Sequence, residues 1–223
     1  MKSTGEAFRV PLAERNMRIG LLGGSFNPAH AAHRHISLTA LKRLGLDQVW
    51  WLVTPGNPLK ADAKQPSLEK RVAAARAVAN HPRIVVTGLE GARRSPYTVD
   101  TLKFLKRRFP GVRLVWLMGA DNLSELHHWH DWPELFRLMP IAVFDRPGFR
   151  LKGMSSKAAQ RFQVYRVDDS DAPGLASLEP PAWTILSEKL SSLSSTSLRK
   201  SGGKAAKKAT KAAKSAKASR PKT

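Results

Sequence analysis

The 223-residue chain contains no cysteine. Disulfide bonds, cysteine-ligated zinc, iron–sulfur clusters and thiol catalysis are therefore excluded. Long apolar segments are also missing, because no window reaches the roughly 18 uninterrupted apolar residues of a membrane span. The first residues carry charges and lack the apolar stretch of a signal peptide. We therefore expect a soluble, cytoplasmic protein.

Acidic residues are scarce relative to basic ones: 17 Asp+Glu stand against 38 Lys+Arg, which gives a net charge of +21. Residues 200–223 hold nine Lys/Arg and no acid, which leaves 29 − 17 = +12 on residues 1–199. This Lys/Ala-rich segment has no apolar face to bury, so we expect a disordered basic tail. Two interpretations of the tail stay open: a solubilising extension, or non-specific contact with nucleic acid or another anionic surface.

Residues 1–199 are long enough for one domain with a sizeable core, and the first ~16 of them are expected to be loosely attached. Short apolar runs predict buried strands at 17–22, 49–53, 84–86, 112–118 and 141–144. Helical periodicity fills the intervals at 35–44, 68–80 and 98–108. Strands that are apolar on both faces and alternate with helices indicate a parallel sheet covered on both sides, a three-layer α/β fold. Further strands are expected at 162–167 and 184–190, and a loop at 170–181.

The most informative stretch, LLGGSFNPAHAAHRH at 21–35, follows the first predicted strand. Gly23 and Gly24 let backbone N–H groups approach a phosphate without a Cβ in the way. His30 and His33 are three residues apart near a helix N-terminus, where an anion is favoured and imidazoles can donate hydrogen bonds. The alternatives are ordinary capping or surface histidines, or a metal pair. The metal pair is disfavoured because the chain has no His-Glu-x-x-His pattern.

A second candidate phosphate-binding segment, LSSTSLR, lies at 193–199. Ser195 and Thr196 offer hydroxyl and backbone donors at the start of a helix, and Arg199 offers a permanently charged fork. Alone, such a segment is typical of a loop or a helix cap. Together with the first motif it indicates a second phosphate contact.

Residues 23–33 resemble the GG[ST]F[DN]PxHxGH signature of the HxGH nucleotidylyltransferases, and residues 193–199 resemble the ISSTxIR motif of the same family. Members have a Rossmann-like, mainly parallel sheet and transfer a nucleotide from a nucleoside triphosphate with release of pyrophosphate. The chain departs from the signature at Asn27, where Asp is common, and at Ala32, where the motif has Gly.

Four further segments resemble the nicotinate-mononucleotide adenylyltransferase branch of that family: SPYTVDTL at 95–102, MGADNL at 118–123 followed by Trp129, PGNPLK at 55–60 and DRPG at 145–148. The resemblance covers about residues 18–199. It implies transfer of AMP from ATP to nicotinate mononucleotide, which yields deamido-NAD and pyrophosphate in NAD biosynthesis. The alternatives are another HxGH nucleotidylyltransferase, or a non-enzymatic protein that binds nucleic acid through the tail.

The resemblance also implies roles for individual residues. The expected catalytic residues are His30, His33 and Arg199. The expected ATP-binding residues are Gly23, Gly24, Ser25, Phe26, Gly119, Asp121, Ser195 and Thr196. The expected mononucleotide-binding residues are Lys60, Tyr97, Thr98, Trp129 and Arg146.

Some of these residues keep simpler alternatives: Trp129 as a packed aromatic, Lys60 as a solvated surface lysine and Arg146 as part of a structural turn. Mg²⁺ is expected on the ATP phosphates, with no metal site made by the protein itself. The expected partners are ATP and nicotinate mononucleotide. The basic tail replaces an apolar C-terminal helix of many family members, so the oligomeric state stays open.

Overall fold

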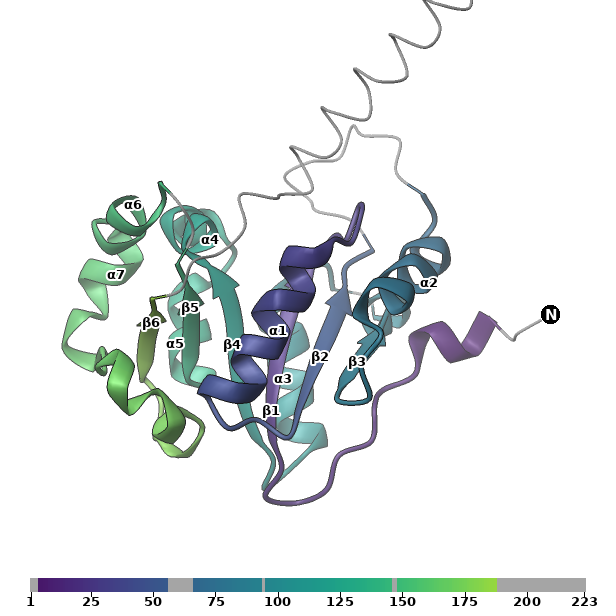
Figure 1. The fold of residues 1–223 in the computed structure, drawn as a ribbon, viewed down its shortest axis with the longest axis horizontal. Coiled ribbons are helices and arrows are strands. Elements are labelled where there is room, and N and C mark those ends of the chain that lie inside the picture. Colours follow the sequence, from purple (N-terminus) through teal and green to yellow (C-terminus); the bar gives the residue numbers. More distant parts are fainter. Residues whose placement is uncertain (1–3, 56–65, 94, 146–147, 188–223) are drawn as a thin grey trace, which may run out of the picture.

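The computed structural model describes residues 4–55, 66–93, 95–145 and 148–187. Its centre is a six-stranded sheet in the order β3-β2-β1-β4-β5-β6, in which all neighbouring strands are parallel (Figure 1). The strands are β1 (Arg18–Gly24), β2 (Gln48–Val53), β3 (Ile84–Thr87), β4 (Arg113–Gly119), β5 (Ile141–Phe144) and β6 (Trp183–Leu186). The five strands expected from uninterrupted apolar runs are confirmed, and the sixth begins within one residue of its expected start.

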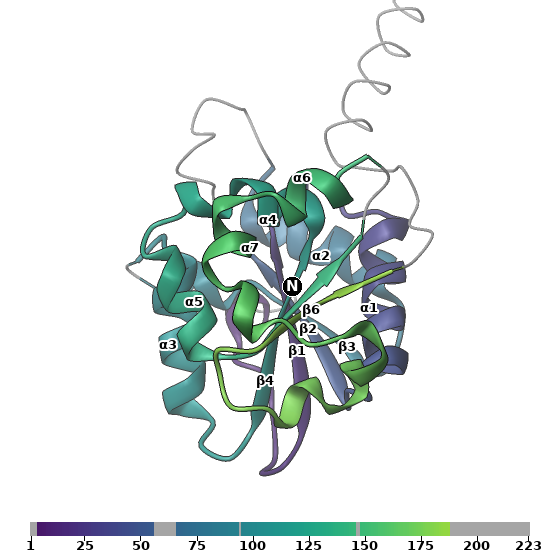
Figure 2. The same ribbon diagram turned by 90° about the vertical axis from the view of Figure 1, so that its left-hand side faces the viewer.

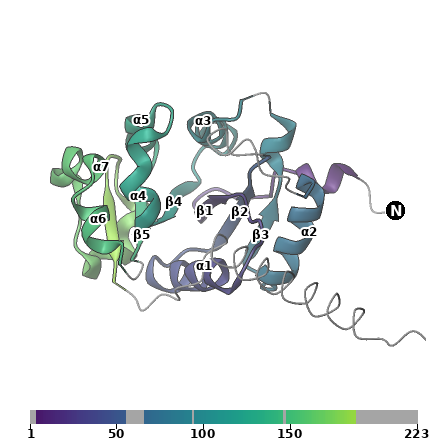
Figure 3. The same cartoon turned by 90° about the horizontal axis from the view of Figure 1, so that it is seen from above.

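Helices cover both faces of the sheet, as the view from above shows (Figure 3). The longer helices are α1 (Ala31–Arg43), α2 (Leu68–Ala79) and α3 (Thr98–Arg108). The shorter ones are α4 (Ala120–Glu125), α5 (Trp132–Leu138), α6 (Arg150–Met154) and α7 (Lys157–Arg161). The 3-10 helices are η1 (Thr4–Phe8), η3 (Leu89–Ala92), η4 (Leu126–His128), η5 (Gln163–Tyr165) and η6 (Asp169–Ser177).

The sheet separates two apolar cores. On one face, α1, α2 and η6 bury residues such as Ile36, Val72 and Leu175 against Trp51. On the other face, α3, α4, α5 and α7 pack around Trp50, Trp116 and Trp183. This arrangement confirms the predicted three-layer α/β fold. None of the helices in the described part combines the length and apolar character that a membrane crossing requires.

The strand order reverses between β1 and β4, the two central strands. The chain runs from β1 outward to β2 and β3, then returns to β4 and runs outward to β5 and β6 at the opposite edge, which faces the viewer in Figure 2. In open parallel sheets, ligands bind beyond the carboxyl ends of the strands at such a switch point. This edge of the sheet, the upper one in Figure 1, is therefore where a functional site is expected.

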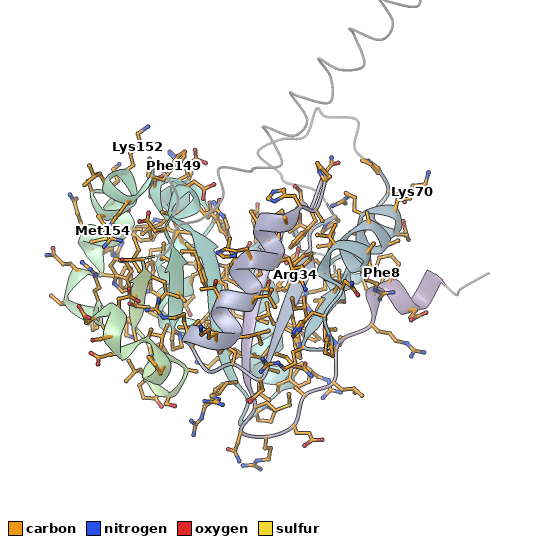
Figure 4. All side chains as sticks on the ribbon, in the orientation of Figure 1. Phe8, Arg34, Lys70, Phe149, Lys152 and Met154 are labelled. Atoms are coloured by element: carbon orange, nitrogen blue, oxygen red, sulfur yellow. The ribbon has the colours of Figure 1, made fainter. Side chains whose placement is uncertain are left out.

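The N-terminal segment lies against the end of β3. The backbone N–H of Gly88 donates to the Ala7 carbonyl over 2.7 Å, and the Thr87 hydroxyl donates to the Arg9 carbonyl over 2.7 Å. Phe8, labelled in Figure 4, lies so close to Gly91 that an added Cβ there would come within 2.8 Å of its ring. Within the N-terminal segment, Ala7 and Arg9 are thus hydrogen-bonded to the end of β3.

Two expectations near the C-terminus differ from the structure. The predicted strand at 162–167 is wrong, because Gln163–Tyr165 form η5 and only Arg166 makes an isolated bridge to Trp183. The apolar residues that suggested a strand do not share a buried face, since Val164 is 85% exposed. The expected loop at 170–181 contains η6, whose start is capped by Asp168 accepting from the Ser170 N–H over 2.9 Å.

Candidate active site

The glycine-rich segment predicted to approach phosphate forms the end of β1 and its exit. An added Cβ at Gly23 would lie 2.5 Å from the Trp116 ring of β4, so close packing against that ring requires a glycine here. The Gly24 carbonyl accepts from the Thr54 N–H over 3.0 Å, which continues the parallel pairing with β2 beyond the last paired strand residue. The glycines therefore bring the exits of β1, β2 and β4 together.

The side chain of Phe26 points into the protein core beneath the candidate site. Its backbone has a positive φ of 45°, and its ring is only 1% exposed. The ring stacks on Trp51 with centroids 5.0 Å apart and lies 4.7 Å from the ring of His33. Because the side chain of Phe26 is buried against His33, only the backbone of Phe26 could contact a bound nucleotide.

His30 and His33 lie together at the start of α1. His30 is the N-cap residue and is 7% exposed, and the two ring centroids are 3.9 Å apart. The His30 backbone N–H donates to Nδ1 of His33 over 3.2 Å. Because Nδ1 accepts this bond, the neutral His33 ring carries its proton on Nε2, which becomes the hydrogen-bond donor.

A short hydrogen-bond chain fixes the first turn of α1 on the sheet. The Trp51 indole N–H donates to the Ser37 hydroxyl over 2.7 Å, and this hydroxyl donates to the His33 carbonyl over 2.9 Å. Ala32, which replaces the motif glycine, is buried within this turn. Farther along, Arg34 donates to the Ala79 carbonyl at the end of α2 over 3.2 Å, and Figure 4 shows this arginine between the two helices.

The segment after β4 faces the one after β1. Leu22 pairs with Leu117, and each of the two strands ends two residues later, at Gly24 and Gly119, on the carboxyl edge. The Asp121 carboxylate folds back over Gly119, where an added Cβ would collide with it. Gly119 and Asp121 therefore line the β1–β4 switch point, as expected of residues that contact a nucleotide there.

A second cluster lies at the start of α3. Tyr97 is the N-cap of α3 and Thr98 its first residue, and the Tyr97 ring is stacked on His130 with centroids 4.1 Å apart. The Ser95 hydroxyl donates to the Asp100 carboxylate and accepts from the Tyr97 N–H over 3.3 Å, which fixes the turn. His130 directly follows Trp129, so this stack brings the two segments expected to bind the pyridine ring into contact.

The turn before this cluster contains a buried acid. Glu90 of η3 is 7% exposed, and this burial raises the pKa of its carboxyl to about 7. A hydrogen bond from Thr101 and the charge of Arg93 oppose the shift only in part. The buried carboxyl connects the end of β3 with α3 below the Tyr97 segment.

Five of the predicted site residues lie outside the described part of the chain: Lys60, Arg146, Ser195, Thr196 and Arg199. The tail at 200–223 lies outside it as well. In the described residues, no group of three or more His, Asp or Glu side chains is arranged to hold a metal ion.

Sequence reasoning missed two residues close to the site, His130 and Arg71. The only feature of the sequence that points to His130 is its position next to Trp129. The sequence points more clearly to Arg71. It lies four residues before Ala75 and eight before Ala79, so it shares the buried face of α2, where an arginine is unexpected.

Comparison with known proteins places this chain among nucleotide-transferring enzymes. A cytidylyltransferase-like family model matches residues 21–201. The "probable nicotinate-nucleotide adenylyltransferase" of Methylorubrum extorquens strain PA1 is 57% identical over 183 residues, which are 82% of this chain and 99% of that protein. The protein of the same name from Mesorhizobium japonicum is 48% identical over 191 residues, 86% of this chain and 98% of its own length.

A solved structure shows the same fold. Plasmodium falciparum nicotinic acid mononucleotide adenylyltransferase, complexed with NaAD, superposes with a TM-score of 0.62 at 19% identity, and the match covers 83% of each chain.

Proposed function

Because this chain belongs to the nicotinate-nucleotide adenylyltransferases of the cytidylyltransferase-like family, we propose that it transfers AMP from ATP to nicotinate mononucleotide. The products are deamido-NAD and pyrophosphate, and the reaction is a step of NAD biosynthesis. The observation that carries the proposal is the pair of adjacent histidines at the start of α1, the N-cap His30 and His33 of the first turn, with ring centroids 3.9 Å apart at the carboxyl edge where β1 and β4 diverge. A nucleotide bound at that switch point presents its phosphates to the helix N-terminus.

The chemistry needs positioning more than activation. A 5′-phosphate oxygen of the mononucleotide attacks the α-phosphorus of ATP in line, a new P–O bond forms, and the bond to pyrophosphate breaks. The attacking oxygen is already anionic, so no general base is required. Catalysis then consists of alignment and of stabilising negative charge on the α-phosphate and the leaving group.

The histidines are the described groups best suited to that charge. His33 offers Nε2–H as a donor, because its Nδ1 accepts from the His30 backbone. His30 lies at the N-cap of the 13-residue helix α1, where the helix dipole adds to the attraction for an anion. Gly119 and Asp121 would receive the ribose, as acidic residues after a strand do in related dinucleotide sites.

The pyridine ring is assigned to the second cluster. Trp129 offers a flat aromatic face, and the Tyr97–Thr98 turn offers hydroxyl and backbone donors for the nicotinate carboxylate. By resemblance to the family, Lys60 and Arg146 would contact the mononucleotide phosphate. Ser195, Thr196 and Arg199 would contact the ATP phosphates.

A divalent metal, Mg²⁺ in this proposal, would neutralise part of the triphosphate charge when bound. The described residues contain no group of three His, Asp or Glu side chains suited to an ion. In the proposal the ligands of the ion are mainly phosphate oxygens and water, which suits the reluctance of Mg²⁺ to dehydrate. A cytoplasmic location is part of the same proposal.

The decisive experiment measures pyrophosphate release from ATP with a panel of acceptors. We expect release with nicotinate mononucleotide, with deamido-NAD identified by mass spectrometry. The amide, nicotinamide mononucleotide, would leave donors of the Tyr97 turn unpaired at about 1–3 kcal/mol per buried group, so kcat/KM falls roughly tenfold to hundredfold. Release with phosphopantetheine or a flavin mononucleotide instead would assign the chain to another branch of the family.

A further inference from the structure

Arg71, in the first turn of α2, is a buried cation that the proposed reaction has not yet used. It is 3% exposed and directly follows Lys70, which Figure 4 labels at the outer surface of α2. Its guanidinium donates to four backbone carbonyls: Ser25 over 2.8 Å, Thr54 over 2.7 Å, Pro55 over 2.9 Å and Pro66 over 3.1 Å. One side chain thus joins the exit of β1, the exit of β2 and the approach to α2.

Within the described residues no carboxylate contacts Arg71, and Glu69 on the same helix attracts its charge only through space. Desolvation lowers the pKa of its guanidinium, which nonetheless stays protonated at neutral pH. Burying a charge that is held mainly by neutral carbonyls is costly, and an apolar side chain would avoid this desolvation but would take the donor away from all four carbonyls. The four carbonyls belong to loops at the carboxyl edge of the sheet, where the proposed site lies. The guanidinium charge of Arg71 is therefore buried next to the place where an anionic substrate would bind.

The bond to Ser25 has a direct geometric effect on the site. In a trans peptide the carbonyl and the N–H point in opposite directions. Because the Ser25 carbonyl is held toward Arg71, the N–H of Phe26 points away from it. The backbone of Phe26 has an unfavourable positive φ of 45°. The ring of the same residue packs against His33, with the two ring centroids 4.7 Å apart. Releasing the Ser25 carbonyl would therefore disturb the turn and the histidine together.

We propose that Arg71 is a positioning residue for adenylyl transfer, an inference that rests on the proposed function. Its guanidinium fork holds the Ser25–Phe26 turn and the exit of β2 in the conformation that receives the triphosphate. Its positive charge, which the carboxylate of Glu69 offsets only in part, lies behind the same turn and favours the anionic substrate. The fork sets the alignment of the reacting groups, and the charge contributes to the affinity for ATP.

The test separates these two contributions with Arg71→Lys and Arg71→Met. Lysine keeps the charge but cannot reach all four carbonyls with one ammonium group, whereas methionine removes both charge and donors. We expect Arg71→Lys to retain the KM for ATP within about threefold while kcat falls ~10²-fold, the cost of a misplacement of about 1 Å. We expect Arg71→Met to lose kcat to the same extent and to raise the KM for ATP about tenfold as well.

Arg76 supplies the matched control on the same helix. Its guanidinium also donates to backbone carbonyls, those of Val86 and Glu6, but it is half-exposed and lies away from the strand exits. Arg76→Lys and Arg76→Met should lower Tm without changing kcat or KM. If the Arg71 variants behave in this way too, with lower Tm and unchanged kinetics, the residue is structural and the inference is overturned.

Two further measurements distinguish failure of the proposed function from failure of the proposed role of Arg71. Calorimetric binding of the non-hydrolysable ATP analogue AMPCPP reports on the triphosphate turn without any turnover. Wild-type protein that binds AMPCPP but forms no deamido-NAD would refute the proposed function, and weaker AMPCPP binding by Arg71→Met would still support the role of the charge. If Arg71→Met does not fold, Arg71→Lys decides: wild-type kcat in that variant would refute the positioning role.

Discussion

The buried carboxyl of Glu90 makes the stability of this protein depend on pH in a direction opposite to that of most acidic groups. The carboxyl has an ordinary pKa of 4.5, which burial raises to about 7 in the folded protein. Between these pH values the folded state binds more protons than the unfolded state, so the free energy of unfolding falls as pH rises. The contribution is present in full below pH 4.5 and is lost as pH rises through about 7.

The size of the effect follows from the same two values. The interval from 4.5 to about 7, at about 1.4 kcal/mol for each pH unit, corresponds to about 3 kcal/mol. Glu90→Gln removes the titration and keeps an oxygen that accepts from Thr101, but it leaves an amide N–H₂ to be satisfied at about 1–3 kcal/mol. At pH 5 the variant should therefore be less stable than the wild type, and at pH 8.5 it should be equally stable or more stable.

Urea denaturation from pH 5 to pH 8.5 measures this crossing directly. The quantity of interest is the difference in free energy of unfolding between wild type and Glu90→Gln, because other groups titrate equally in both proteins. Glu179→Gln makes the same change of acid to amide at an exposed position and is the matched control. Parallel stability curves for wild type and Glu90→Gln would refute the assignment of Glu90 as a carboxyl that is protonated in the folded state.

Three further predictions concern α1, the end of β1 and the tail. His33→Ala should lower kcat about 10²-fold with a modest change in KM for ATP, as loss of one donor to a developing charge does, and near wild-type turnover would remove His33 from the mechanism. Gly23→Ala should destabilise the fold by about 1–3 kcal/mol in urea denaturation, because the new Cβ would lie 2.5 Å from Trp116, and an unchanged midpoint would contradict the packing argument. Deleting residues 200–223 should leave adenylyl transfer intact but weaken retention on DNA at low salt, since nine cations are removed. Lost activity in that truncated chain would instead give the tail a structural role.

The sheet could be predicted from the sequence because parallel strands are buried on both faces and read as uninterrupted apolar runs. Segments whose structure depends on distant partners could not. Phe162 resembles the start of a strand, but its ring stacks on Phe136 and its carbonyl accepts from the Trp183 indole, so it ends a helix instead. The 3-10 helix η6 was hidden in a similar way, because its few buried residues pack against the nearby strand β6 and against β4 far along the chain and give no helical periodicity of their own.

In the candidate site, too, local features could be predicted from the sequence and contacts between distant segments could not. The spacing of His30 and His33 was enough to predict that their side chains lie together, because three residues form nearly one helical turn. The stack of Tyr97 on His130 depends on the approach of two separate connections between strands, for which spacing holds no information. Gly23 was predicted as a phosphate-approach residue, whereas in the structure its missing side chain makes room for Trp116.

The strand order also has a consequence for how the chain acquires its site. The strand made first, β1, is central, and its partner β4 begins at Arg113, about 95 residues later. A growing chain can assemble β1, α1, β2, α2 and β3 early, but one edge of β1 then stays unpaired, which is a hazard for aggregation. The β1–β4 seam that closes this edge is also where the proposed nucleotide site lies. Folding of the second half thus completes the sheet and creates the site in one event, and a ligand bound across the seam would hold the two halves together.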